Sequence, residues 1–247
     1  KDVAVVTRVG TDALGEATVE KLSALGLPLE GIQRDPDLAT GTVLVTVDKQ
    51  NEPRFEIVTP AAWDAIDLAA ASRLADQGPF HLVFGTLAQR DERSRRTIRA
   101  LWDRAIWRFY DINLRPPFTT KELVLESLKV ADVVKANGAE LVQIAQWLGE
   151  PETDKRMVAR SLAERFRIAA LAVTEGAAGA WLVAGNEVYE HPGFPAEVAD
   201  TVGAGDAFFA TLIDGYIAGR AWQDCLAVAN QRGSYVASQP GATPRMP

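Results

Sequence analysis

One segment in the last fifth of the chain places small residues and a carboxylate where a helix is predicted to begin. It reads Asp200-Thr201-Val202-Gly203-Ala204-Gly205-Asp206, and an apolar helical stretch follows from Ala207. Small residues let an anion approach the backbone, and a helix start directs free N–H groups and a positive dipole end at that anion. A carboxylate there repels the anion unless it has chemical work, so Asp206 is predicted to take a proton from an attacking hydroxyl. The charge on a transferring phosphoryl group would be stabilised by the N–H groups of Gly203, Ala204 and Gly205.

An ordinary helix N-cap is the alternative explanation for an Asp and a Gly at such a position. A capped core helix needs only one such residue, and it does not need Gly-Ala-Gly with acidic residues on both sides. Other phosphate-binding motifs do not fit. Residues 10–15 have the glycine spacing of a Walker A loop, but Glu16 stands where that loop requires lysine, and no GxGxxG fingerprint follows a strand. We therefore interpret the whole heptad as a catalytic segment.

The composition is that of an ordinary folded protein and argues against several classes. Of the 247 residues 47% are hydrophobic and 24% charged, and the net charge is −7 with no dense block of Lys or Arg, so no nucleic-acid partner is expected. No apolar run approaches the roughly 18 to 20 residues that span a bilayer, so no membrane partner is expected either. Cys225 is the single cysteine, which fits a cytoplasmic location, and the two histidines have no cysteine partner at zinc-ligand spacing.

Short apolar runs alternate with amphipathic stretches, which is typical of a layered α/β fold. Strands are expected at residues 3–7, 80–85, 109–112, 133–135 and 168–173, and helices at 12–25, 92–107, 121–131, 139–148, 154–166, 204–218 and 221–238. Two hairpins are expected, one from strands 42–47 and 54–58 around a polar turn at 48–53, the other from strands 180–183 and 188–190. We predict a single α/β domain over residues 1–247, with helices on both faces of a mostly parallel sheet and ligands at the carboxyl ends of the strands. The first hairpin, at about 40–60, is predicted to be a lid.

The heptad, extended by Ala207 and Phe208, resembles the C-terminal signature of the ribokinase-like (PfkB) carbohydrate kinases. Further pieces resemble that family's motifs in the family's order, so the resemblance covers essentially the whole chain. They are residues 8–15, a first lid strand from 40, an N-x-x-E motif from Asn137 to Glu140, a T-x-G-x-x-G loop at 174–179, Asn230, and Pro240-Gly241-Ala242. The resemblance implies a ribokinase-like three-layer sandwich with a mostly parallel central sheet and a small β-strand lid. The family also opens with a strand, an early Asp and a Gly-Gly-x-x-x-Asn motif, and this N-terminal segment is expected to be missing from the sequence.

The same resemblance implies a role for each matching residue. Asp206 would be the catalytic base, with Gly203, Ala204 and Gly205 as the anion hole. Thr174, Gly176 and Gly179 would line the ATP site, and Asn230 would lie near the adenine. Asn137 and Glu140 would lie near the phosphates and a Mg²⁺ ion, which binds mostly through phosphates and water. A monovalent cation, K⁺ in this family, would be bordered by Asp200 and the carbonyl of Val202.

The segment at residues 110–117 is predicted to contact the substrate, because it ends a strand where ligands bind. Its D-x-N-x-R-P-P form, with Asp111, Asn113 and Arg115, resembles fructokinases and 2-keto-3-deoxygluconate kinases more than ribokinases. Arg115 can offer a planar fork to an anion, or it can pair with a surface carboxylate, and its spacing leaves both open. Gly85 would line the pocket. Trp63 lies in a stretch that resembles a fructokinase segment, so it either reaches the sugar or packs in the core.

We therefore expect an enzyme that transfers the γ-phosphate of ATP to a hydroxyl of a small sugar. Fructose is the sugar expected in the first place. The alternatives are 2-keto-3-deoxygluconate kinase, ribokinase and nucleoside kinase. A non-catalytic sugar or nucleotide sensor on the same fold is the alternative outside enzymes, and retention of Asp206 with the whole heptad argues against it. Lid strands with exposed edges can pair between copies, so a homodimer is an open possibility.

Overall fold

The computed structural model describes residues 2–47, 53–150 and 154–246. The chain divides into two compact units, and each is described by itself. The first unit comprises Lys1–Leu82 with Leu87–Ile106, and the second comprises Val83–Thr86 with Trp107–Pro247. No helix in the described ranges combines the length and hydropathy needed to cross a bilayer.

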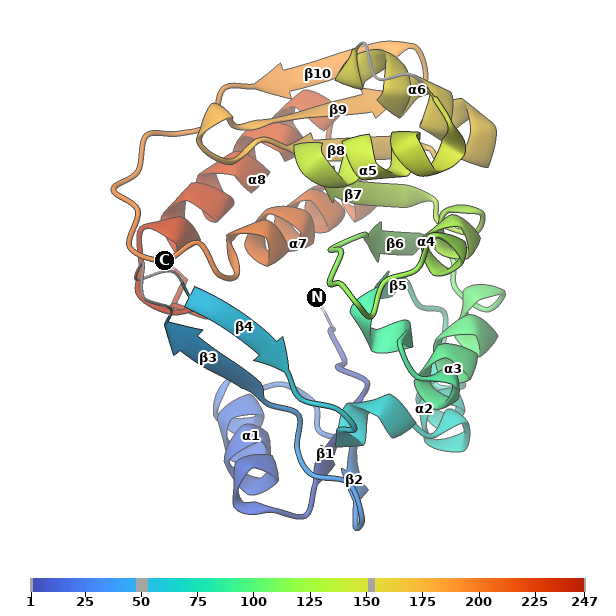
Figure 1. Ribbon diagram of the computed structural model, residues 1–247, viewed down its shortest axis with the longest axis vertical. Helices are drawn as coiled ribbons and strands as arrows, with labels where there is room; N and C mark the ends of the chain where they lie inside the picture. The colour runs from blue at the N-terminus through green and yellow to red at the C-terminus, as the bar shows by residue number, and fades with distance from the viewer. Residues whose placement is uncertain (1, 48–52, 151–153, 247) are drawn as a thin grey trace. The chain divides into compact units, whose positions relative to one another are not determined.

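The first unit is built from two small sheets and short helices. Strands β1 (Thr7–Gly10) and β2 (Ile32–Asp35) pair in parallel, with helix α1 (Ala13–Ala24) beside β1 (Figure 1). Helix α1 begins where the Asp12 carboxylate accepts from the backbone N–H of Gly15 at 2.8 Å. The unit continues through the 3₁₀ helix η1 (Ala62–Ala65), α2 (Leu68–Ala75), the 3₁₀ helix η2 (Leu87–Gln89) and α3 (Glu92–Trp102).

The predicted lid hairpin is confirmed as a pair of strands. β3 (Val43–Val47) and β4 (Pro53–Ile57) pair in antiparallel register, with Val43 opposite Ile57 and Val45 opposite Phe55. Most of the predicted turn, residues 48–52, lies outside the described residues. The hairpin therefore exists as a separate two-stranded sheet, as the alternation of Thr and aliphatic residues predicted.

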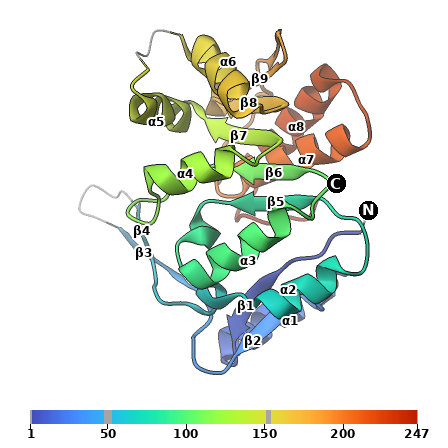
Figure 2. The same ribbon diagram turned by 90° about the vertical axis from the view of Figure 1, so that its right-hand side faces the viewer.

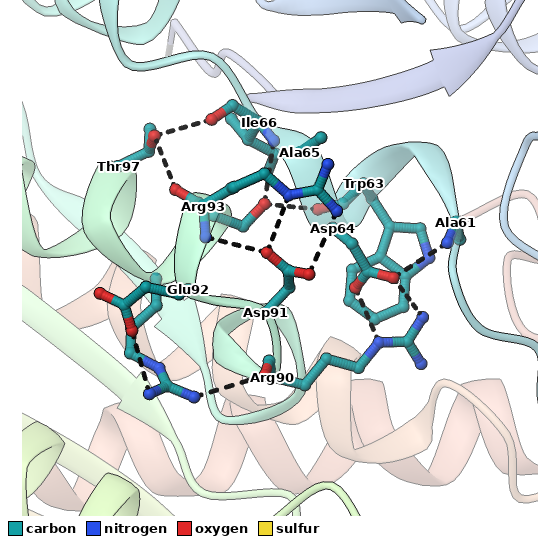
Figure 3. A network of polar contacts seen from close by, with 12 residues as sticks. Ala61, Trp63, Asp64, Ala65, Ile66, Arg90, Asp91, Glu92, Arg93 and Thr97 are labelled. Carbon is teal, nitrogen blue, oxygen red and sulfur yellow. Dashed lines mark hydrogen bonds and ion pairs between the residues drawn. The ribbon is translucent and has the colours of Figure 1, made fainter. Parts of the chain in front are cut away.

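A buried ion pair holds the two ends of this hairpin (Figure 3). Arg90 donates to both carboxylate oxygens of Asp64, at 2.7 and 2.8 Å, and to the carbonyl of Val58 at 3.0 Å. Its guanidinium lies 3.9 Å from the ring centroid of Trp63. A Cβ added to Gly41 would come within 2.3 Å of the Trp63 indole nitrogen, so that ring lies directly against the residues that lead into β3. Trp63 thus packs as a structural residue between the start and the end of the hairpin.

The second unit contains a six-stranded sheet in the order β10-β9-β8-β7-β6-β5. β6, β7 and β8 run parallel, while β9 and β10 add to one edge in antiparallel pairing. The strands are β5 (Leu82–Gly85), β6 (Arg108–Asp111), β7 (Val133–Asn137), β8 (Ala170–Thr174), β9 (Ala180–Ala184) and β10 (Glu187–His191). The predicted second hairpin is therefore present as β9 and β10.

Helices cover both faces of this sheet (Figure 2). One face carries α4 (Lys121–Leu128), α5 (Gly138–Leu148) and α6 (Lys155–Phe166), and the other carries α7 (Ala204–Ile217) and α8 (Trp222–Ala237). Phe109, Val133 and Ala172 lie in the fully buried core between the sheet and α7 and α8, together with Phe208 and Leu212. The predicted three-layer α/β sandwich with a mostly parallel central sheet is confirmed.

Some element boundaries differ from the sequence-based expectation. The strand expected at 3–7 is wrong, because β1 begins only at Thr7, where β2 supplies a partner. β2 was not predicted, since Ile32-Gln-Arg-Asp shows no apolar alternation, and α2 was also missed. Helix α3 ends at Trp102 instead of 107, where the N–H groups of Arg104 and Ala105 turn back to the carbonyl of Leu101.

Helix α7 begins at a glycine that no other residue could replace without a shift of the backbone. Gly203 has φ +83°, and a Cβ placed there would lie 2.2 Å from the carbonyl oxygen of Ala242. The left-handed conformation and the close approach both require glycine. Gly219, which follows the same helix, has φ +70° but only open space around its Cβ position.

Replacing Asp64 by Asn should lower the free energy of unfolding by about 3 to 5 kcal/mol, because it removes one charge of a buried, hydrogen-bonded ion pair. The side chains of Arg90 and Asp64 are only 4% and 2% exposed. Glu16→Gln is the control, since it breaks the solvent-exposed pair with Arg34 and should cost less than about 1 kcal/mol. Urea denaturation of the two variants measures the difference. Equal losses would show that burial of the pair has no energetic consequence.

Gly203→Ala should destabilise the protein more than Gly219→Ala. Alanine at Gly219 meets only the cost of the left-handed conformation, roughly 1 to 2 kcal/mol, whereas alanine at Gly203 must also displace the Ala242 carbonyl. Thermal unfolding of both variants gives the comparison. An equal loss in the two variants would mean that the Ala242 segment moves away freely.

Candidate active site

The site is built from the carboxyl ends of β6, β7 and β8 on the face that α7 covers. Side chains alternate between the faces of a strand, so residues two positions beyond the core residues Phe109, Val133 and Ala172 point toward the same helix layer. These next positions are Asp111, Lys135 and Thr174, and the parallel register places Asp111 opposite Lys135. Three polar side chains therefore reach one edge of the sheet from separate strands.

The first turn of α7 lies against this edge. A Cβ placed on Gly205 would be 3.2 Å from the ammonium nitrogen of Lys135 and 3.5 Å from its Cε, so the lysine fills the space that the second glycine of the heptad leaves open. Asp206 lies in the same turn and is exposed. The heptad and the strand ends, distant in sequence, thus form one cluster within the second unit.

The N-terminus of α7 has no side-chain cap, because its N-cap residue is a glycine. Gly203 stands at the N-cap position, and no side chain of the described residues accepts from the first turn there. The preceding turn is held by the Asp200 carboxylate, which accepts from the N–H of Val202 at 3.0 Å. The N–H of Ala204 donates to the Thr201 carbonyl over a long 3.3 Å. Of the three donors of the predicted anion hole, the Ala204 N–H therefore makes a weak local bond.

An ion pair that the sequence did not reveal lies at the centre of the cluster. The Lys135 ammonium donates to both Asp111 carboxylate oxygens, at 2.9 and 3.0 Å, and the two side chains are 9% and 14% exposed. Burial raises the pKa of Asp111 to about 6; the neighbouring Lys135 opposes that shift, and the carboxylates of Glu140 and Asp206 add to it. The same four charged groups therefore share one electrostatic environment.

Lys135 was not among the predicted site residues. The available signal was its place in Val-Val-Lys-Ala-Asn, a buried strand in which a charged residue is unusual without a partner. The partner, Asp111, lies 24 residues earlier, and only strand pairing brings the two side chains together.

Asn137 and Glu140 are brought together as a capping box at the start of α5. The Asn137 side chain accepts from the N–H of Glu140 at 2.9 Å, and the Glu140 carboxylate accepts from the N–H of Asn137 at 2.8 Å. The other Glu140 oxygen accepts from the N–H of Leu114 at 2.9 Å. The buried Glu140 thus fixes the predicted substrate loop to the predicted phosphate site.

The rest of the predicted substrate segment is arranged by that loop. Asn113 has φ +41°, a left-handed conformation that Asn tolerates better than most residues. Gly85 is close by, since a Cβ there would lie 3.3 Å from the Asp111 carbonyl. Arg115 is exposed and donates to the carbonyl of Leu114, so no described contact holds it toward Asp111 or Asp206.

The predicted nucleotide loop joins β8 to β9 through the 3₁₀ helix η3 (Gly176–Ala178). Thr174 lies opposite Asn137 in the parallel register, which places these two predicted ATP contacts side by side. Gly179 has φ +83°, and a Cβ there would lie 2.1 Å from the His191 carbonyl, so the loop is packed tightly. Glu175 and Ala178 of this loop also line a cavity of about 460 Å³, with Lys155, Trp181 and His191 among its walls. Asp206 does not line that cavity.

Two predicted site residues, Asn230 and Asp200, form hydrogen bonds within their own segments. Asn230 is 6% exposed on α8 and donates to the Leu226 carbonyl of its own helix. Asp200 already accepts the bond from Val202 described above. Across the described ranges, no three His, Cys, Asp or Glu side chains gather as a metal site.

Asp111 should make stability depend on pH in a direction opposite to that of most carboxylates. Its pKa is raised from 3.8 to about 6, so between these values the folded protein binds more protons than the unfolded chain, and stability falls as pH rises. The free energy of unfolding of the wild type, minus that of Asp111→Asn, should fall by roughly 3 kcal/mol from about pH 3.5 to about pH 7. Urea denaturation across that range tests this. A difference that stays flat or rises with pH would contradict a raised pKa at Asp111.

Comparisons with known proteins agree with this arrangement. The profile described as pfkB family carbohydrate kinase matches residues 1–247. The chain is 28% identical over 256 residues to a fructokinase of Vibrio alginolyticus, covering 97% of this chain and 81% of that protein. It is 26% identical over 247 residues to an ATP-dependent ribose-1-phosphate kinase of Halopiger xanaduensis, covering 98% and 76%.

A solved fructokinase from Vibrio cholerae O395, in a fructose, ADP and calcium ion bound form, superposes with a TM-score of 0.81 at 25% identity over 97% of this chain and 80% of that one. A ribokinase from Thermotoga maritima shares the fold, with a TM-score of 0.75 at 21% identity over 96% and 75%. The resemblance stated from the motifs is thus confirmed over the whole chain. This chain belongs to the pfkB family of carbohydrate kinases, and it is a sugar kinase with the ribokinase-like fold.

Proposed function

We propose that this sugar kinase transfers the γ-phosphate of ATP to a hydroxyl of fructose, with Asp206 as the base. The observation that carries the proposal is the exposed Asp206 carboxylate in the first turn of α7, a helix N-terminus without a side-chain cap. Fructose is favoured as the acceptor because the relatives include fructokinases, one of which was solved with fructose and ADP. The D-x-N-x-R-P-P segment resembles both fructokinases and 2-keto-3-deoxygluconate kinases, so it argues against ribose but does not separate these two sugars.

In this mechanism Asp206 accepts the proton of the sugar hydroxyl while its oxygen forms a bond to the γ-phosphorus. The bond from that phosphorus to the bridging oxygen breaks, and ADP leaves with the electron pair. The N–H groups of Gly203, Ala204 and Gly205 stabilise the charge on the phosphoryl oxygens, and Ala204 gives up its long bond to Thr201 to do so. Exposure of Asp206 leaves it free to meet the hydroxyl.

ATP would be held by the loop between β8 and β9 and by the strand ends beside it. Thr174 and Asn137 are adjacent in register, and Gly176 and Gly179 supply the backbone conformations of a tight anion-binding loop. Asn230 is proposed near the adenine. Mg²⁺ would neutralise the phosphates. Both carboxylate oxygens of Glu140 already accept backbone N–H bonds, so the ion would be bound mostly through phosphates and water and not by this side chain directly. A K⁺ ion is proposed beside Asp200 and the Val202 carbonyl.

Arg115 and Asn113 are proposed to select the sugar. Both follow β6 directly after Asp111, on a loop that Glu140 fixes through Leu114. The exposed Arg115 side chain can turn toward an anionic substrate, which would favour 2-keto-3-deoxygluconate over a neutral sugar. Ribose is the third acceptor to compare, because one relative is a ribose-1-phosphate kinase.

Asp206→Asn should lower kcat by about 10²- to 10⁴-fold while the Kd for ADP changes less than about threefold, because the amide cannot accept the proton. ADP formation in a coupled assay and calorimetric titration with ADP give the two quantities. Asp224→Asn is the matched control, since it makes the same change at an exposed Asp in the first turn of α8 and should leave both unchanged. Full turnover in the Asp206 variant would remove the base assignment.

ADP formation by the wild type with fructose, 2-keto-3-deoxygluconate and ribose, each as sole acceptor, tests the substrate. Fructose should give the highest kcat/KM. A preference for 2-keto-3-deoxygluconate that disappears in Arg115→Gln would reassign the substrate to the anionic sugar. Background ADP formation with all three sugars would contradict the proposed function.

A further inference from the structure

Lys135 lies in an electrostatic setting that an ion pair with Asp111 alone does not explain. Its ammonium is next to Gly205, in the first turn of a 14-residue helix, where the helix dipole is positive and repels a cation. A lysine that served only to neutralise Asp111 would be better placed away from that turn. The position suits a cation that shares an anion with the helix N-terminus.

The charges around Lys135 indicate which kind of anion that is. The carboxylates of Glu140 and Asp206 interact electrostatically with the carboxylate of Asp111. The Lys135 ammonium is hydrogen-bonded to Asp111 in the same buried region. Three carboxylates against one ammonium leave a negative excess where an anionic phosphoryl group must pass. A cation already held at this point lowers the cost of bringing that group in, and it acts strongly because the side chain is 9% exposed.

The glycine of the heptad closest to Lys135 supports a defined place for the ammonium. A methyl group at position 205 would stand 3.2 Å from the nitrogen, so the helix approaches the lysine as closely as a side-chain-free residue allows. Asp111, on the neighbouring strand β6, accepts two hydrogen bonds from the ammonium nitrogen. The ammonium is therefore fixed between a carboxylate on one side and the start of α7 on the other.

We propose that Lys135 is a further catalytic residue of this kinase: Asp111 holds its ammonium at the first turn of α7, where it contacts the phosphoryl group during transfer and neutralises the charge on its oxygens. The inference rests on the proposed function. In the step described above the proton still passes from the sugar hydroxyl to Asp206, and Lys135 gives up no proton; it only donates hydrogen bonds.

A double-mutant cycle of Lys135→Met and Asp111→Asn separates this role from a structural one. Lys135→Met should lower kcat for the best sugar about 10²-fold, with the KM for that sugar within about threefold, since one donor to the transferring group is lost. A smaller loss, still more than about threefold, should separate Asp111→Asn from the double variant, because Lys135 stays beside Gly205 but is no longer held there by Asp111. If Lys135→Met has no further effect in the Asp111→Asn background, Lys135 acts only through Asp111 and the proposal is overturned.

Comparison of the Tm values of the single and double variants serves as the control for folding. Lys135→Met alone leaves Asp111 buried without a partner and should lower Tm, whereas the double variant removes both charges and should recover most of that loss. Arg108→Met is the matched control. It breaks the ion pair with Asp132, 2.8 Å long, at the amino ends of the same two strands, and it should leave kcat unchanged.

Binding supplies a readout that does not depend on turnover. ADP with fluoroaluminate, an anionic mimic of the moving phosphoryl group, should bind about 10²-fold more weakly to Lys135→Met than to the wild type, while the Kd for ADP alone changes less than threefold. Equal affinity for fluoroaluminate in the two proteins would overturn the proposal. A wild type without kinase activity that still loses fluoroaluminate binding on Lys135→Met would instead contradict the proposed function and leave the anion contact standing.

Discussion

Parallel pairing of β6, β7 and β8 beneath helix α7 is the constraint on which the site depends. The register places Asp111 beside Lys135 and Asn137 beside Thr174. A slip of one residue would turn each of these side chains to the opposite face of the sheet. The core residues that precede them, Phe109, Val133 and Ala172, are locked under α7 and α8 and prevent that slip. Packing of an apolar layer thus sets the position of the polar groups that follow it.

Backbone geometry contributes as much to the site as the side chains do. Gly203 and Gly179 both combine a positive φ with a carbonyl that comes closer than any side chain would allow, from Ala242 and His191 respectively. Each glycine ties a loop of the site to a distant part of the second unit. The tight loops that are proposed to surround the phosphates are thus held in place by neighbouring backbone instead of by side chains.

The first unit shows the same dependence on a single interaction at the base of the hairpin. Arg90 binds Asp64 and the carbonyl of Val58, the residue that follows β4. Trp63 packs against Gly41, two residues before β3. The buried, bidentate pair of Arg90 and Asp64 stacks on the Trp63 indole and fixes the base of the hairpin. On the hairpin itself, Val43, Leu44 and Val45 are half exposed. A fixed base beside exposed strand residues is the arrangement expected of the predicted lid.

The sequence by itself determined the fold class, the hairpins and the helix start within residues 200–206, because periodicity, turn residues and the N-terminal signals of a helix are local. The capping box of Asn137 and Glu140 is local too, since its partners lie three residues apart, but it was not predicted; only the N-x-x-E spacing was recognised. Tertiary structure decided what depends on distant partners. The strand Ile32–Asp35 carries no apolar alternation and exists because β1 pairs with it. Lys135 meets Asp111 across 24 residues and Gly205 across 70, and Glu140 holds Leu114 through a bond that no local pattern announces. Such contacts follow from the packing of α7 on the sheet, which no short stretch of sequence encodes.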